Sequence, residues 1–117
     1  MSQFLLQAVR PPIISNCLAY RSIAERSSPG SAVSPTMAAN VSSIDTVITW
    51  AFVNPNPGLP FAIGPCDGMI TVISEVTWSV ASSYTVTVAA TNDGTLIGLG
   101  STVSSCLVTI DILQVKY

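Results

Sequence analysis

Residues 84–94, YTVTVAATNDG, decide the fold class of this chain. From Tyr84 to Thr91, larger apolar residues at even positions alternate with hydroxyl-bearing or small residues at odd positions. A period of two is typical of a β-strand with one buried face. The pattern stops at Asn-Asp-Gly, which favours a turn. The stretch therefore predicts a strand whose even-numbered side chains point into a core.

The composition extends this prediction to the whole chain. Val, Ile and Thr together supply 35 of the 117 residues, against only 8 Leu. Branching at Cβ favours the pleated surface of a sheet over a helix. A chain of this length buries roughly two-thirds of the surface that its unfolded form exposes, which is enough for one independent domain. We therefore expect a single all-β domain.

The rest of the sequence repeats the alternation in shorter stretches. In TVITWAFV, residues 46–53, the side chains of Ile48, Trp50 and Phe52 share one face, which we expect to point inward. Pro35 lacks a backbone donor, which places its strand at an edge or a bulge. The pattern favours a Greek-key sandwich of about seven strands. The predicted strand regions are 13–24, 32–39, 46–53, 61–63, 69–74, 78–80, 84–91 and 102–113.

Charged residues are scarce in this chain, and this excludes several classes of protein. They make up 9% of the sequence, against about 25% in an average soluble domain. With only four basic residues and a net charge of -2, the chain has no cationic patch for nucleic acid. Ser and Thr interrupt every apolar run, so no transmembrane helix is predicted. A surface this poor in charge is either covered by neighbours or glycans, or kept soluble by hydroxyl groups alone.

Catalytic signatures are missing from the sequence. The chain has no His, which is the common general base, and its six acidic residues are scattered. The short GLGS at 98–101 is typical of a turn and does not form a phosphate-binding loop. Most of the aromatic residues alternate inward and favour a core role over a sugar-stacking platform. They are Trp50, Phe52, Phe61, Trp78 and Tyr84. We therefore expect a protein that is not an enzyme.

Two modification signals remain open at the level of the residues. Three cysteines, Cys17, Cys66 and Cys106, are too widely spaced for a zinc site. They fit either one disulfide and one free or intermolecular thiol in an oxidising compartment, or three buried thiols. Asn40-Val41-Ser42 is a glycosylation sequon, either an occupied one or a chance match in a Ser- and Thr-rich chain.

Four stretches, taken in order, resemble an extracellular cadherin repeat. A Glu precedes a Pro-Gly turn and a Val-rich strand, a Phe-x-Ile…Gly-x-Ile pattern lies mid-chain, and a Tyr strand ends in an Asn-x-Gly turn. The stretches are IAERSSPGSAV at 23–33, TWAFV…PFAIGPCDGMITV at 49–72, YTVTVAATNDG at 84–94 and VSSCLVTIDI at 103–112. The same pattern is similar to cadherin-like and immunoglobulin-like repeats of bacterial and protist surface proteins. The resemblance covers about residues 12–113 and implies a cadherin- or immunoglobulin-like sandwich.

This resemblance also implies a disulfide and a calcium-binding role. In a cadherin-type sandwich the first and last strands are neighbours, which implies the pair Cys17–Cys106. Cadherin repeats bind calcium between neighbours, and Glu25 matches the family's early glutamate, while Glu75 stands near its Asp-Arg-Glu position. Asn92 replaces an Asp and loses its charge.

The linker motif of the family is also replaced, by DILQVKY at 111–117. Because calcium needs six to eight oxygen ligands and compensating charge, we expect no cofactor and no tight calcium site. Glu25 and Glu75 are then solvated ends of strands or turns.

The sequence thus leads to three functional hypotheses. We first expect an extracellular or cell-surface structural module, the subunit of a fibre or a repeat of a tandem adhesive array, whose domain covers residues 12–117. Residues 1–11, with the apolar segment FLLQAV, would form an extension or a strand that adds to a neighbour's sheet. The alternatives are a module that binds a carbohydrate or a receptor through loops 54–60 and 92–100, and calcium-dependent adhesion.

Overall fold

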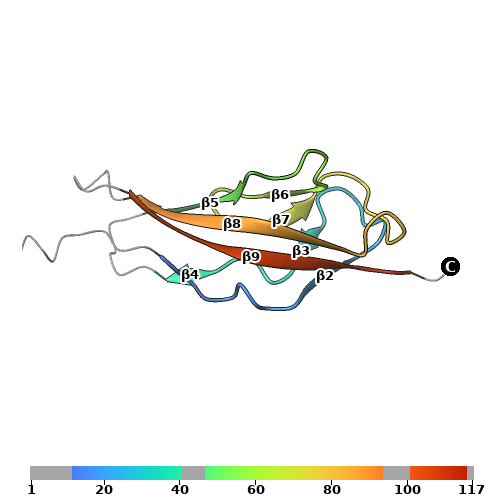
Figure 1. The fold of residues 1–117 in the computed structure, drawn as a ribbon, viewed down its shortest axis with the longest axis horizontal. Coiled ribbons are helices and arrows are strands. Elements are labelled where there is room, and N and C mark those ends of the chain that lie inside the picture. Colours follow the sequence, from blue (N-terminus) through green and yellow to red (C-terminus); the bar gives the residue numbers. More distant parts are fainter. Residues whose placement is uncertain (1–11, 41–46, 94–100, 116–117) are drawn as a thin grey trace, which may run out of the picture.

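The computed structural model describes residues 12–40, 47–93 and 101–115, and the regular elements in this part are all strands. Two long antiparallel strands, β8 and β9, run along the molecule, and the shorter strands pack around them (Figure 1). None of the described residues belongs to a helix long and apolar enough to cross a membrane. The strands are β1 (Ile13–Ile14), β2 (Arg21–Ala24), β3 (Ala32–Val33), β4 (Ala39–Asn40), β5 (Val47–Val53), β6 (Phe61–Ile63), β7 (Ile70–Val72), β8 (Ser83–Asp93) and β9 (Ser101–Leu113).

The strands form two packed layers, as predicted. One layer is a four-stranded sheet in the order β2-β9-β8-β5, in which only the β2–β9 pair is parallel. The other layer contains the sheet β3-β7-β6 and the small pair β1-β4. Neighbours in these sheets are often distant in sequence, as expected for Greek-key connections. The prediction of an all-β sandwich is confirmed.

The alternation read from the sequence places the correct residues in the core. Val86, Val88 and Ala90 of β8 are buried, as are Val108, Ile110 and Ile112 of β9. The register of β8 with β9 sets Val86 opposite Val108, so both strands bury the same face. On the other layer, Val33, Phe61, Ile70 and Val72 close the core.

The predicted first strand region, 13–24, is divided into two strands. β1 pairs with β4 and β2 pairs with β9, so the chain moves from one layer to the other between them. The segment that joins them turns back on itself and contains Cys17. The buried guanidinium of Arg21 stabilises the segment by donating to the carbonyls of Asn16 and Ala19, at 3.0 and 3.3 Å. The residue pattern gave no indication of this role for Arg21.

The predicted strand at 78–80 is wrong. Residues 77–80 form a turn, in which the N–H of Val80 donates to the carbonyl of Thr77 at 3.1 Å. Trp78 and Val80 are exposed, so Trp78 is not part of the core. A three-residue alternation of apolar residues was too short to distinguish a strand from a turn. The predicted strand at 32–39 is also not continuous: Pro35 lies in no strand, between β3 and β4, which belong to different sheets.

Candidate interaction groove between the two layers

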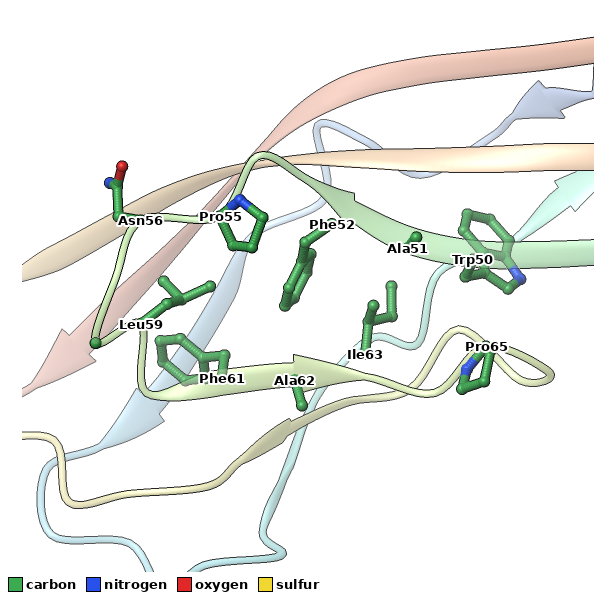
Figure 2. Close-up of a pocket in the computed structure, with 11 residues that line it drawn as sticks. Trp50, Ala51, Phe52, Pro55, Asn56, Leu59, Phe61, Ala62, Ile63 and Pro65 are labelled. Carbon is green, nitrogen blue, oxygen red and sulfur yellow. The ribbon is translucent and has the colours of Figure 1, made fainter.

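An open groove separates the edge strands of the two layers, β5 and β6. The strands meet at one end, where the N–H of Trp50 donates to the carbonyl of Pro65 at 2.9 Å, and diverge toward the loop at 54–60. Figure 2 shows side chains from both strands and from the loop around the space between them. The cavity has a volume of about 460 Å³. We call it the β5–β6 groove, and its principal lining residues are Trp50, Phe52, Leu59, Phe61, Ile63 and Pro65.

The deep wall of the groove is fixed by close packing. Trp50 is buried, and it lies directly against Gly68. A Cβ atom added to Gly68 would come within 3.0 Å of the Trp50 ring, and the φ of Gly68, +70°, favours glycine. The ring of Phe61 packs edge to face against the ring of Tyr84, and the two ring centroids are 5.4 Å apart. These contacts leave the partly buried Phe52 and Ile63 as the accessible apolar surface.

The loop at 54–60 closes the far end of the groove. A turn in which the N–H of Leu59 donates to the carbonyl of Asn56, at 3.1 Å, carries Leu59 toward the space between the strands (Figure 2). Gly58, with a φ of +79°, provides the positive φ that this turn contains. The prolines of the loop restrict it to few conformations, so the end of the groove is preformed.

None of the described residues that line the groove is ionisable. The nearest acidic residue in sequence, Asp67, uses its carboxylate to accept the N–H of Met69 at 2.9 Å. A surface of this kind provides no general acid, base or nucleophile, and it favours apolar, uncharged groups. The groove is therefore suited to binding. Loop 54–60 belongs to the alternative hypothesis of a binding module, whereas the place of β6 in the wall of the groove was not predicted because it depends on how the two layers meet.

The predicted cysteine pair lies away from the groove. Cys17 and Cys106 form a disulfide with their Cα atoms 6.2 Å apart, which attaches the segment between β1 and β2 to β9. Cys66 is free and exposed. Around the disulfide, Leu18 and Leu107 are strongly exposed.

Of the three predicted calcium residues, Glu25 and Glu75 lie at one end of the domain and Asn92 lies at the other. Glu25 follows β2 and bonds through its backbone to Leu113, whereas Asn92 lies opposite Thr102 at the other end of β9. At about 3.3 Å per residue, Glu25 and Asn92 are roughly 35 Å apart along the sheet. Glu75 is exposed near Glu25.

The carboxylate of Glu25 is already occupied by backbone groups. It accepts N–H groups from Val115 at 2.8 Å and Trp78 at 3.1 Å, and these bonds lower its pKa. In the ranges 12–40, 47–93 and 101–115, no group of three acidic or cysteine side chains is placed to hold a metal ion.

The remaining predicted site positions fall partly outside the described residues. Asn40 ends β4, where its backbone pairs with Ile13, and its occupancy by a glycan stays a prediction. The segment 1–11 and most of the loop 92–100 lie outside the described part of the chain.

Comparison with known proteins identifies the fold. No protein-family profile matches the sequence, and no curated protein is similar to it. Among solved structures, extracellular cadherin domains 3–6 of protocadherin gamma B2 share 27% identity over 88% of this chain, with a TM-score of 0.69. PcdhgB3 EC1-4 shares 26% over 91% (TM-score 0.74), and mouse cadherin-23 EC22-24 shares 23% over 88% (TM-score 0.70).

The chain spans 22%, 26% and 32% of the lengths of these three solved chains, respectively. This share corresponds to one part of each multidomain structure. The fold of the described residues is therefore the cadherin-type β-sandwich, and the expected fold is confirmed.

Proposed function

We propose that this cadherin-like domain is a non-enzymatic extracellular adhesion module that acts as a subunit of a fibre or as a repeat of a tandem array. The proposal rests mainly on the outer face of the sheet β2-β9-β8-β5. Among the described side chains of β5, β8 and β9, this face carries one charged residue, Asp111. Its exposed members are Thr49, Ala51, Val53, Ser83, Thr85, Val103, Ser105, Leu107, Thr109 and Leu113. Such a face has little electrostatic protection against association.

Two further observations support the extracellular part of the proposal. The solved neighbours are described as extracellular cadherin domains. The Cys17–Cys106 disulfide is of the kind that persists in oxidising compartments. Protein partners, meaning further copies or neighbouring repeats, then follow as the expected ligands of the uncharged surfaces.

Sedimentation velocity and negative-stain imaging of the purified chain test this proposal. We expect species larger than the 12.2 kDa monomer, increasing with concentration, and elongated assemblies in the images. A monodisperse monomer at high concentration would contradict the role as a self-associating subunit.

The β5–β6 groove favours a second candidate function, the binding of a carbohydrate or receptor segment. Its loop and cavity are preformed, which reduces the cost of ordering on binding. A glycan array probed with the native chain and with Leu59→Ala tests it. Loss of a specific signal in the variant would favour this function, and an array without signal would count against carbohydrate.

We also propose that the fold needs no calcium. Since the oxygen donors at Glu25 and Asn92 are far apart, chelation with EDTA is expected to leave the melting temperature unchanged. A clear rise in melting temperature on adding Ca²⁺ would contradict this. In eukaryotic material, the intact mass before and after glycosidase treatment tests whether Asn40 carries a glycan.

A further inference from the structure

We infer that the β5–β6 groove takes up residues 3–9 of a second copy of this chain, QFLLQAV, as an additional strand on the open edge of β6. This inference rests on the self-association proposed above and specifies the surface that performs it. It is drawn from the hydrogen-bonding state of the two strand edges, the chemistry of the groove and the place where the described chain begins.

The edge of β6 that faces the groove has backbone groups without a partner. Ile73 donates its N–H to the carbonyl of Pro60 at 2.8 Å, and Gly64 donates to Met69 at 2.9 Å. In an antiparallel ladder, hydrogen-bonded residue pairs alternate with pairs that are not hydrogen-bonded. Ala62 and Thr71 are therefore a hydrogen-bonded pair, and the backbone N–H and C=O groups of the residues on either side of Ala62 point away from β7.

These residues are Phe61 and Ile63. Within the described part of the chain, their backbone N–H and C=O groups make no hydrogen bond and are directed toward the groove. An exposed row of this kind is a template for an extended peptide, which gains main-chain hydrogen bonds by adding to the sheet.

The opposite rim of the groove, on β5, also has backbone N–H and C=O groups that point into the groove. The N–H of Trp50 points away from β8, because it donates to Pro65. By alternation, the backbone groups of Phe52 also point away from β8 and into the groove. A strand added to β6 would therefore lie between two rims that both present backbone donors and acceptors.

The chemistry of the groove selects an uncharged apolar occupant. Its lining contains no ionisable residue, so an occupant with a charged side chain would lose hydration without gaining a partner. The segment QFLLQAV has no charged residue and places Phe4, Leu6 and Ala8 on one side of an extended chain. In a strand added to β6, these apolar side chains would face the apolar lining at Phe52 and Leu59.

The start of the described chain favours a second copy as the donor. Residue 12 leads directly into β1, which pairs with β4, whereas β6 lies at the far end of the sheet order β3-β7-β6. In Figure 1, the blue beginning of the described chain and β4 lie at the lower side of the molecule, and β5 and β6 lie at the upper side. Residue 12, from which the donor segment extends, and the acceptor edge of β6 thus lie on opposite sides of one copy.

Because the donor segment and the acceptor edge are different parts of the chain, the contact between two copies is not symmetric. A contact between two different surfaces of identical subunits is heterologous, and it repeats from copy to copy unless the rotation closes it into a ring. Strand addition of this kind therefore generates a fibre without any further interface if the rotation between copies leaves the contact open.

Three single substitutions in the full chain, each adding one negative charge, test the inference by sedimentation velocity. Leu59→Asp alters the groove, Leu6→Asp alters the donor segment, and Ser105→Asp alters the outer face of β9, which is the competing surface for association. Melting curves establish that each variant is folded. We expect Leu59→Asp and Leu6→Asp to weaken association by at least about tenfold, and Ser105→Asp to weaken it clearly less than either of them.

The outcomes separate this inference from the proposed function. If Ser105→Asp alone disrupts the assemblies, association uses the outer face, so the groove inference is overturned while self-association stands. If the native chain does not associate, both fail. A specific glycan signal that Leu59→Ala abolishes, with association unchanged in Leu59→Asp, would assign the groove to carbohydrate.

Cross-linking provides a second test that does not depend on an inserted charge. Chains carrying Leu6→Cys and chains carrying Leu59→Cys, both with Cys66→Ala, are mixed and mildly oxidised. We expect a covalent dimer, and none when Ser105→Cys replaces Leu59→Cys. A cross-linked monomer from a chain that carries both Leu6→Cys and Leu59→Cys, without dimer, would show that the segment folds onto its own groove and would overturn the role of a second copy.

Discussion

The Glu25 carboxylate joins two segments that are distant in the sequence. Its oxygens accept the N–H groups of Trp78 and Val115, so it connects the turn after β7 and the end of β9 to the end of β2. Both bonds are made to the ionised form, which is why they lower the pKa of Glu25 below its ordinary value of 4.5. Glu25 thus has a structural role at one end of the sandwich.

Replacing Glu25 by Gln should lower the melting temperature, and the effect should depend on pH. Because the folded-state pKa is depressed, the stabilisation is complete above pH 4.5 and is lost as the pH falls through the folded-state value. Melting curves from pH 7 to pH 3 should show a difference between native and Glu25→Gln that shrinks below pH 4.5. Glu75→Gln, at a nearby exposed position, is the control and should melt like the native chain. A difference that is constant with pH would argue against this role.

Gly68 and Gly30 form a matched pair for testing the packing behind the groove. Both have a positive φ, but an added Cβ would lie 3.0 Å from the Trp50 ring at Gly68 and would meet nothing within 4 Å at Gly30. Gly30→Ala should therefore cost about 1 kcal/mol of unfolding free energy from backbone strain, and Gly68→Ala about 1–3 kcal/mol more from overpacking. Urea denaturation measures both. Equal costs would contradict the packing at Trp50.

At the scale of elements, the parallel pairing of β2 with β9 brings the beginning and the end of the described chain together. The Cys17–Cys106 disulfide covers the same region and spans 89 residues of sequence. A covalent link over so long a loop restricts the unfolded state strongly. The guanidinium of Arg21 also stabilises the linked segment, because it donates hydrogen bonds to the carbonyls of Asn16 and Ala19.

Removal of this disulfide should destabilise the domain by about 2–4 kcal/mol. We expect this loss of unfolding free energy in the double variant Cys17→Ala, Cys106→Ala, measured by urea denaturation. Cys66→Ala, which removes the exposed free thiol, is the control and should be near neutral. Labelling of the unfolded, unreduced native chain should modify one thiol. Labelling of all three would show that the disulfide does not form.

At the scale of the whole molecule, the shortage of charge determines how copies interact. With ten ionisable acidic and basic side chains in 117 residues, and a groove without any, association depends mainly on apolar contact and backbone hydrogen bonds. Such contacts are insensitive to ionic screening, and excluded salts such as sulfate strengthen them.

Association should therefore persist in about 1 M NaCl, where charges are screened within about 3 Å. Sedimentation velocity at low and high NaCl, and with added sulfate, measures this. We expect the same or larger species at high salt. Dissociation to monomer at high NaCl would show that charge pairs hold the assembly, and it would contradict an apolar interface.

The sequence by itself determined the fold class and the inward faces of the main strands. Alternation is a local property with a period of two, so Trp50, Val88 and Ile110 could be placed in the core without knowing their partners. The same local logic failed at Trp78, where a short apolar run forms an exposed turn. The implied cysteine pair came from resemblance to a family whose first and last strands are neighbours.

Which strands lie at the edges of their sheets, with backbone groups left unpaired, could be seen only in the folded chain. That Phe61 and Ile63 direct their backbone groups into a groove depends on the register of β6 with β7 and on the approach of β5 from the other layer. The use of Glu25 by two backbone N–H groups likewise depends on segments brought together from far apart. Pairing partners and register are non-local, and residue patterns along one strand do not specify them.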